Sequence, residues 1–263
     1  MAWALDLDGV VWLGRTPIPG AAEAVARLRA AGERVAFVTN NSFGRRSDVA
    51  AKLAAHGIEP GDDIVTSAVV AAGLVEAGSR ALVCGGPGIV EELELRGVEV
   101  VDASDPAATD GRFDVVVVGY HPTFDYHRMD TAAAAVRSGA RLLATNDDAT
   151  YPMDAGIKPG GGAILASIAT AAGATPEVAG KPHRPAAQWV TERLGPDGVM
   201  VGDRPDTDGR FAVALGYRFG LVLSGVTTAA DLPTEPPADL TAPDLASLVA
   251  AALDEPLARP GPA

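Results

Sequence analysis

The sequence predicts an α/β fold in which a doubly wound parallel sheet carries helices on both faces. Short apolar runs of strand length alternate with alanine-rich stretches whose apolar residues recur at helical spacing. The runs are almost continuously apolar, which is typical of parallel strands buried on both faces. With 263 residues, of which 48% are hydrophobic, the chain is long enough for one such domain or for two smaller ones.

The alternation can be followed from one end of the chain to the other. Ser47 is a predicted N-cap, and Gly57 is a predicted helix stop. The glycine clusters 85–88 and 160–162 lack a complete nucleotide-binding pattern and are predicted to be strand-to-helix turns. The predicted strands are 3–7, 35–39, 81–84, 115–119, 141–145, 198–202 and 220–224; the predicted helices are 21–31, 47–56, 129–138, 163–172, 185–194 and 245–253; and 254–263 is predicted to be a poorly ordered tail.

The first predicted strand ends in two acids, Asp6 and Asp8. Residues two apart on a strand point to the same face, so both carboxylates are expected to enter one small volume. Like charges this close favour a bound cation, for which Mg²⁺ is the natural candidate. A solvated strand end that carries two acids by chance is the alternative, and the spacing alone leaves both interpretations open.

Polar residues also follow other predicted strands. Thr39, Asn40 and Asn41 follow the second strand, 146–148 (Asn-Asp-Asp) follow a middle one, and Asp203 follows the strand at 198–202. Because functional side chains of parallel α/β sheets gather at the carboxyl ends of strands, these residues are expected to contribute to a site.

Composition excludes several classes of function. The 34 acidic and 21 basic residues give a net charge of -13, which disfavours nucleic acid and anionic membrane surfaces as partners. The single cysteine, Cys84, rules out an internal disulfide and a thiolate-rich metal site, and the four histidines show no zinc spacing. Without a signal-peptide pattern or a run long enough to span a bilayer, the expected location is the cytoplasm.

Five segments in a fixed order carry a family resemblance. They are Asp6-Leu7-Asp8-Gly9, residues 37–42 (Phe-Val-Thr-Asn-Asn-Ser), Gly180-Lys181-Pro182, residues 201–208 and residues 222–227. In this order the chain resembles the haloacid dehalogenase superfamily of phosphatases, and within it the NagD-like and nitrophenylphosphatase-like subfamily IIA. The resemblance covers roughly residues 5–228. It implies a Rossmann-like core formed by residues 1–79 and 180–263, with an inserted α/β cap of the C2 type at 80–179.

The resemblance also implies a reaction. Asp6 would be the nucleophile that forms an aspartyl-phosphate, and Asp8 would protonate the leaving group and later activate water. Thr39, the amide of Asn40, and Lys181 would hold the phosphate.

The same resemblance implies a metal site and a specificity loop. Mg²⁺ would be bound by Asp6, by the backbone carbonyl of Asp8 and by Asp203. For Asp208 an indirect role beside the metal, through a water or Lys181, and an N-cap role for a helix at 209–215 are left open. The expected specificity residues of the cap are Asn146, Asp147 and Tyr151, and a solvated turn is the alternative for their loop.

The expected activity is therefore Mg²⁺-dependent hydrolysis of a small phosphomonoester, such as glycerol phosphate, phosphoglycolate, a nucleoside monophosphate or a sugar phosphate. A receiver-like phosphoacceptor and a non-catalytic nucleotide-binding α/β protein are the alternatives. The length and the Asp-x-Asp spacing favour the enzyme. Caps of this subfamily often dimerise, so a homodimer is also expected.

Overall fold

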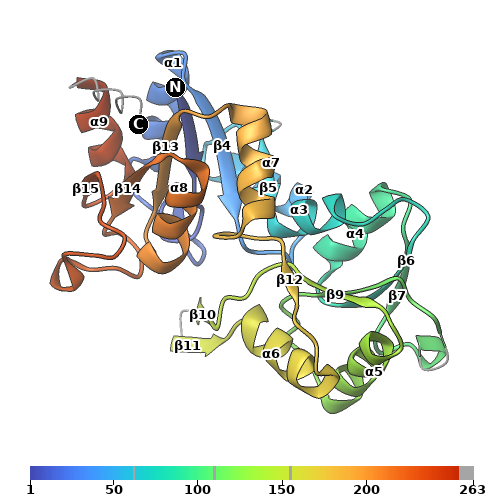
Figure 1. The fold of residues 1–263 in the computed structure, drawn as a ribbon. Helices are drawn as coiled ribbons and strands as arrows, with labels where there is room; N and C mark the ends of the chain where they lie inside the picture. Colours follow the sequence, from blue (N-terminus) through green and yellow to red (C-terminus); the bar gives the residue numbers. More distant parts are fainter. Residues whose placement is uncertain (62, 109–110, 154–155, 255–263) are drawn as a thin grey trace. The chain divides into compact units, whose positions relative to one another are not determined.

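The computed structural model describes residues 1–61, 63–108, 111–153 and 156–254 (Figure 1). The chain divides into two compact units, and each is described by itself. The first consists of Met1–Val38, Lys52–Asp63 and Val190–Ala263, and the second of Thr39–Ala51 and Ile64–Trp189. The limits of these two compact units do not test the predicted domain boundaries at 79/80 and 179/180, which stay a prediction.

The first unit contains a parallel sheet with β1 near its middle. β1 (Ala2–Leu5) pairs with β13 (Gly198–Gly202) on one side and with β4 (Arg34–Thr39) on the other. β14 (Arg218–Val222) and β15 (Leu240–Ala242) follow beyond β13, in the order β15-β14-β13-β1-β4, and every one of these pairs is parallel. All four residues of β1 are buried, as expected for a strand covered on both faces.

Helices cover both faces of this sheet, which confirms the doubly wound arrangement. The side chain of Phe219 on β14 packs against Gly209, where an added Cβ would lie 2.9 Å from the ring. Gly209 directly precedes α8 (Arg210–Leu215). A Cβ at Gly220, the residue after Phe219, would lie 3.0 Å from Leu248 of α9 (Leu245–Asp254). Consecutive strand residues point to opposite faces, so α8 and α9 pack on opposite sides. α9 also contacts α1 (Ala21–Ala30).

The remaining elements of the first unit are short. A small antiparallel hairpin, β2 (Trp12–Leu13) and β3 (Thr16–Pro17), follows the loop after β1. A π-helical turn, η2 (Pro205–Gly209), precedes α8, and a 3-10 turn, η3 (Ala229–Asp231), follows β14. Two helices, α2 (Arg46–Ala55) and α7 (Arg184–Leu194), are each divided between the units.

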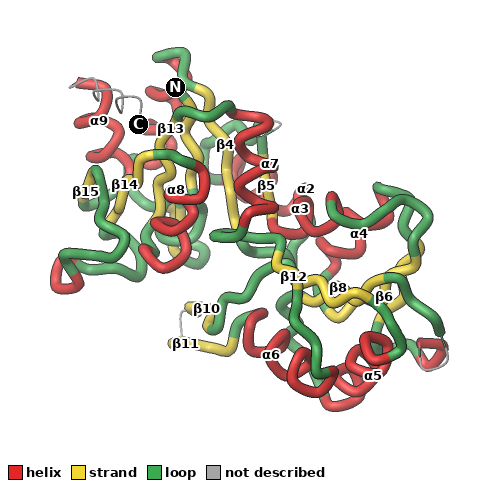
Figure 2. Tube along the Cα trace, viewed as in Figure 1, coloured by secondary structure: helices red, strands yellow, loops and turns green. Residues whose placement is uncertain are grey.

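The second unit has its own sheet, whose strands are drawn yellow in Figure 2. The strand order is β12-β9-β8-β6-β7, and all neighbouring pairs are parallel. Its central strand is the run of four buried valines at 115–118. The strands are β6 (Arg80–Cys84), β7 (Glu99–Asp102), β8 (Val115–Val118), β9 (Arg141–Ala144) and β12 (Glu177–Val178). The other elements are β5 (Ile64–Thr66), α3 (Ser67–Gly73), α4 (Pro87–Leu95), η1 (Pro106–Ala108), α5 (Tyr126–Arg137), α6 (Gly161–Ala172) and the antiparallel hairpin of β10 (Thr150–Met153) and β11 (Gly156–Pro159).

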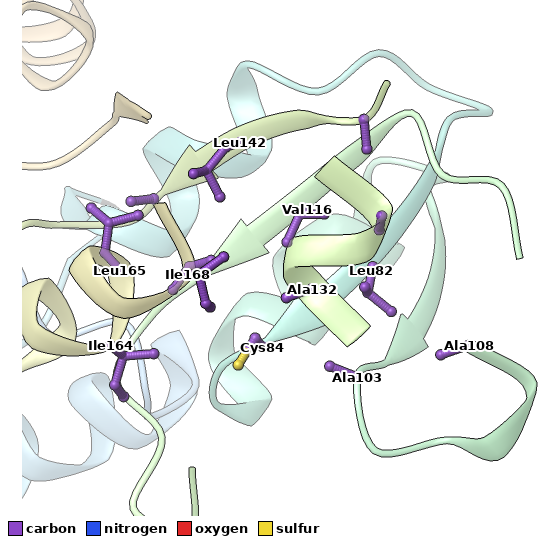
Figure 3. Close-up of a cluster of buried hydrophobic side chains, with 14 residues drawn as sticks. Leu82, Cys84, Ala103, Ala108, Val116, Ala132, Leu142, Ile164, Leu165 and Ile168 are labelled. Carbon is purple, nitrogen blue, oxygen red and sulfur yellow. The ribbon is translucent and has the colours of Figure 1, made fainter. Parts of the chain in front are cut away.

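The core of this unit lies between one face of the sheet and helices α5 and α6. Figure 3 shows Leu82, Val116 and Leu142 of three strands with Ala132 of α5 and Ile168 of α6. Small alanine side chains on α5 let the helix approach the sheet closely. The sheet is therefore held by apolar packing, which leaves its strand ends available for polar residues.

Most of the predicted elements are confirmed, with shifted ends. β1 ends at Leu5 and not at residue 7, because Leu7 begins a turn in which its carbonyl accepts from Val11. The N-cap prediction for Ser47 is wrong, since α2 begins at Arg46 and the Asp48 carboxylate accepts the N–H of Arg45.

Other turn predictions are confirmed. Gly57 follows the end of α2 with a φ of +78°, and the clusters at 85–88 and 160–162 form the turns that enter α4 and α6. Strands β5 and β7 were not predicted, because β5 has three residues and β7 is only half-buried. The predicted tail begins at Asp254, but this residue is the last of α9, and residues 255–263 lie outside the described part of the chain. No helix of the described part is long and apolar enough to cross a membrane.

Candidate active site

Three buried carboxylates converge after two neighbouring strands of the first unit. Asp6 follows β1, Asp203 follows β13, and Asp208 lies on the turn η2. One carboxylate oxygen from each residue lies within 4.8 Å of the other two, and the residues are only 8%, 2% and 1% exposed. Buried like charges at this separation repel one another, and an all-oxygen group of this kind suits a hard cation such as Mg²⁺.

Asp203 is held in place by backbone on both sides. A Cβ at Gly225 would lie 1.9 Å from its Oδ2, and a Cβ at Gly9 would lie 2.4 Å from the same oxygen. Gly9 also has a φ of +85°, which an L side chain rarely adopts. The N–H of Val226 donates to Oδ2 at 2.6 Å. The loop after β1 therefore needs glycine in order to pass the Asp203 carboxylate.

Asp208 faces the same cluster because η2 turns its side chain back toward β13. The N–H of Arg204 donates to its Oδ2 at 3.2 Å, and a Cβ at Gly202 would lie 2.2 Å from its side chain. Helix α8 has Gly209 as its N-cap and no side-chain cap. The N-cap alternative for Asp208 is therefore wrong, and one of its carboxylate oxygens lies within 4.8 Å of those of Asp6 and Asp203.

Asp8 has different surroundings from Asp6. It is only half-buried, and its Oδ1 accepts the indole N–H of Trp12 at 3.0 Å. The ammonium of Lys52 lies 3.8 Å from the centre of the Trp12 ring. Burial lowers the pKa of Lys52, while the negative charge of Asp8 raises it. The Asp8 carboxylate is thus held by the indole of Trp12 and interacts electrostatically with Lys52.

A second polar group, in the other unit, is organised by Asn40. Its Oδ1 accepts the N–H of Lys181 at 2.8 Å, and its Nδ2 donates to the carbonyl of Lys181 at 2.9 Å and to Asp148 at 3.0 Å. A Cβ at Gly180 would lie 2.5 Å from that Oδ1, so glycine permits the close approach. Lys181 is 2% exposed. The Asn40 side chain therefore fixes the main chain that carries a buried lysine.

These bonds limit what Asn40 can do for a ligand. Both N–H groups of its side chain are already used within the protein, so an anion has to be met by other donors of this segment. Thr39, the last residue of β4, is 4% exposed, and its Oγ1 accepts the N–H of Asn41 at 3.1 Å. A hydroxyl that accepts in this way keeps its proton for donation to a ligand oxygen.

Of the predicted specificity residues, Asn146 contacts the polar group around Asn40 directly. Asn146 is 5% exposed and donates from Nδ2 to the carbonyl of Asn40 at 2.8 Å. Asp147 pairs with His183, with 2.9 Å between Oδ2 and Nε2. Tyr151 lies opposite Lys158 in the β10–β11 register, and its side chain is outside the described part of the chain.

The hydrogen bond between Asp147 and His183 shifts both pKa values. It is the main cause that raises the pKa of His183, and it is also the main cause that lowers the pKa of Asp147. Burial opposes both shifts. The pair therefore favours an ionised carboxylate beside a protonated imidazole.

Sequence reasoning missed three of these contacts. Asp148 lies in the predicted segment 146–148 and His183 directly follows Gly180-Lys181-Pro182, but their partners are 108 and 36 residues away in the chain, and no local pattern reports such pairing. Trp12 is four residues from Asp8 and lies outside both the predicted strand at 3–7 and the five segments that carry the resemblance.

The model of the haloacid dehalogenase-like hydrolases matches residues 3–99, and a related model of the same hydrolase class matches residues 178–248. The D-glycerol 3-phosphate phosphatase of Mycobacterium tuberculosis is 37% identical over 236 residues, which cover 86% of this chain. That match spans 64% of the mycobacterial protein, so slightly less than two thirds of its length is represented here.

Solved structures show the same fold. The p-nitrophenyl phosphatase of Archaeoglobus fulgidus superimposes with a TM-score of 0.86 at 31% identity, covering 95% of this chain and 98% of that one. The glycerol phosphate phosphatase of Mycobacterium tuberculosis, in a complex with magnesium, has a TM-score of 0.83 at 35% identity, with 94% and 75% covered.

The carboxylate cluster leads to a metal-binding prediction. Asp208→Asn is expected to weaken Mg²⁺ binding by at least about tenfold, because it removes one of three converging charges. Isothermal titration calorimetry measures the affinity. Asp206→Asn is the matched control, because Asp206 belongs to the same turn but is exposed and pairs with Arg204. Equal affinities of the two variants would remove Asp208 from the metal site.

The Asp147–His183 pair leads to a pH prediction. Asp147→Asn is expected to lower the pKa of His183 toward its ordinary value of 6.5, because the main cause of the upward shift is removed. Imidazole NMR signals followed through the pH range measure this, with His56 and His127 as internal references.

The sign of the linked stability follows from the two shifts. The raised pKa of His183 stabilises the fold at pH values below 6.5, and this contribution is lost as the pH rises through the folded-state pKa. The lowered pKa of Asp147 stabilises the fold above 3.8, and this is lost on acidification. Since both side chains are partly exposed, the pair is expected to contribute less than about 1 kcal/mol. An unchanged His183 titration in Asp147→Asn would contradict the pairing.

Proposed function

This chain belongs to the haloacid dehalogenase-like hydrolase family, and from that we propose that it is a Mg²⁺-dependent phosphatase of small phosphorylated metabolites. The observation that carries the proposal is the cluster of Asp6, Asp203 and Asp208, three buried carboxylates within 4.8 Å of one another. The same family membership removes support from a receiver-like phosphoacceptor and from a non-catalytic nucleotide-binding protein.

The proposed reaction has two steps on Asp6. A carboxylate oxygen of Asp6 attacks phosphorus in line, and the bond to the leaving oxygen breaks while Asp8 gives that oxygen a proton. Asp8, now ionised, removes a proton from water, which attacks the aspartyl-phosphate and releases inorganic phosphate and free Asp6. Bound Mg²⁺ supplies charge neutralisation for the phosphoryl oxygens.

We assign the metal to Asp6, Asp203 and the backbone carbonyl of Asp8, and we add Asp208 because of its place in the carboxylate cluster. The phosphoryl oxygens are assigned to the hydroxyl of Thr39, to the backbone amide of Asn40 and to the ammonium of Lys181. Support for Lys181 comes from its burial and from the two main-chain bonds to Asn40, which restrict where its side chain can start.

The cap is proposed to select the substrate. The segment 80–179 is assigned as the inserted cap, and the parallel sheet from β6 to β12, residues 80–178, supports this limit. Asn146, Asp147 and Tyr151 are proposed to determine specificity, because the contact of Asn146 with Asn40 ties their loop to the phosphate-binding segment.

The protein is further proposed to be a cytoplasmic homodimer. Gel filtration with light scattering tests the oligomeric state.

The activity is tested by phosphate release. With Mg²⁺, glycerol phosphate, phosphoglycolate, nucleoside monophosphates, sugar phosphates and nitrophenyl phosphate form the panel. We expect steady turnover of at least one of them and loss of turnover in chelator. A single stable phosphorylation without turnover would favour a phosphoacceptor, and no phosphate release from any compound would contradict the proposed activity.

Lys181 provides a prediction with a control in the same chain. Lys181→Ala is expected to lower kcat/KM by about a hundredfold, because a buried ammonium beside a phosphoryl group acts in a water-poor site. The chain has three lysines, and Lys52 is engaged with Trp12, so Lys158 on β11 is the exposed control. Similar kinetics for Lys181→Ala and Lys158→Ala would remove Lys181 from the phosphate site.

The two acids after β1 are predicted to fail in different ways. Asp6→Asn is expected to abolish turnover and leave no covalent intermediate, because an amide is a very poor nucleophile. Asp8→Asn is expected to form the aspartyl-phosphate from nitrophenyl phosphate, whose leaving group needs little protonation, and then to hydrolyse it very slowly. Acid quenching and intact-mass measurement detect the phosphoprotein. A phosphoenzyme in Asp6→Asn would overturn the choice of nucleophile.

A further inference from the structure

The loop after β1 folds back so that one residue returns to Asp8. The carbonyl of Leu7 accepts the N–H groups of Val11 and Trp12 at 2.9 and 3.2 Å, and the N–H of Gly9 donates to the carbonyl of Trp12 at 2.7 Å. These bonds close the six residues from Leu7 to Trp12 into a compact turn. The indole of Trp12 is thereby placed beside Asp8, to which it donates its only N–H at 3.0 Å.

The indole is itself fixed from the other side. Its residue is 3% exposed, although the next residue, Leu13, is 53% exposed at the hairpin. The ammonium of Lys52 lies 3.8 Å from the ring centre and donates to the carbonyl of Gly14 at 2.8 Å. The ring of His56 lies 5.8 Å away at an angle of 50°. A cation over a buried indole face holds the ring by electrostatic attraction as well as by contact.

We propose that Trp12 is a positioning residue for Asp8, with Lys52 as the brace behind it. This inference rests on the proposed function. An indole N–H donates and cannot accept, so it holds Oδ1 of Asp8 as an acceptor whether or not the carboxyl group carries a proton. The transferred proton therefore belongs on the other oxygen, Oδ2, and the orientation of the carboxylate is fixed through both reaction steps. Such fixed orientation of an acid-base group is worth a substantial part of its catalytic effect.

A purely structural role for Trp12 is the competing explanation, and the chain offers a matched control. Trp3 on β1 is also buried, at 1% exposure, and its indole nitrogen has no hydrogen-bond partner among the described residues. Trp12→Phe and Trp3→Phe therefore make the same change in volume, but only Trp12→Phe removes a hydrogen bond to Asp8.

The experiment measures both variants with glycerol phosphate and with nitrophenyl phosphate. With glycerol phosphate, Trp12→Phe is expected to lower kcat by about tenfold and to change KM by less than about twofold. With nitrophenyl phosphate, the first step is spared and the water step is slowed, so phosphoenzyme accumulates during turnover and is detected by intact mass. Trp3→Phe is expected to show neither effect.

A second arm tests whether Trp12 acts through Asp8. In an Asp8→Asn background, the added Trp12→Phe change is expected to leave the rate of phosphoenzyme formation within about twofold, because the group that it positions is already disabled. If Trp12→Phe does not fold, Lys52→Met carries the test. It keeps the indole and its hydrogen bond and is expected to give the same accumulation with a smaller loss, about threefold in kcat.

The outcomes separate the two proposals. If the unaltered protein releases no phosphate from any compound of the substrate panel, the proposed function fails. If it is active but Trp12→Phe matches Trp3→Phe, or if Trp12→Phe loses activity equally on both substrates without accumulating phosphoenzyme, only the positioning role is overturned.

Discussion

The mutual repulsion of three buried carboxylates is the constraint on which the rest of the first unit depends. Two unit charges 4 Å apart interact by about 4 kcal/mol at an effective dielectric constant of 20. Net stabilities of folded domains are only about 5–15 kcal/mol, so the repulsion among Asp6, Asp203 and Asp208 is not a small perturbation. A folded protein tolerates such a cluster when a bound cation offsets the repulsion. The surrounding chain holds the carboxylate oxygens in place. Gly9 and Gly225 make room for Asp203, and the N–H groups of Val226 and Arg204 each bind one carboxylate.

The second unit uses the opposite arrangement. In the first unit backbone N–H groups hold side chains, whereas here the side chain of Asn40 holds the backbone on both sides of Lys181. The side-chain amide of Asn40 accepts the backbone N–H of Lys181 and donates to its carbonyl, so these bonds fix the backbone from which the lysine side chain begins. The loop after β9 joins this point through Asp148 and Asn146, which bind the side chain and the carbonyl of Asn40. A change of loop conformation would therefore be felt at Lys181 through one shared asparagine.

Much of the fold could be predicted from sequence because continuous apolar runs and alanine-rich helices carry strong local signals. The four valines of β8 are an example, since a run buried on both faces has few other solutions. The motif residues could be found as well, because family patterns are local. What escaped prediction depends on contacts between distant segments or on half-buried elements. The pairing of Asp147 with His183, the hold of Asn40 on Lys181 and the edge strand β7 leave no periodic trace in the chain. The position of Asp208 was left open for the same reason, because a π-helical turn, and not the helix start expected from the pattern, decides where its carboxylate points.

The structure gives the opening pair of acids different surroundings from those that strand alternation predicts. Strand alternation was expected to bring Asp6 and Asp8 to one face, but β1 ends at Leu5, so neither acid lies within the strand. Asp6 keeps the backbone bond to Val201 of β13 and enters the carboxylate cluster. Asp8 belongs to the turn that starts at Leu7, and an indole and a lysine meet it there. The turn thus gives two aspartates that are two residues apart different surroundings. Asp6 is buried among other carboxylates, where a cation would offset the repulsion, whereas Asp8 is half-buried and accepts a hydrogen bond from an indole. In the proposed reaction, the acid that attacks and the acid that exchanges protons would need different surroundings, and here the difference arises because β1 ends before both acids.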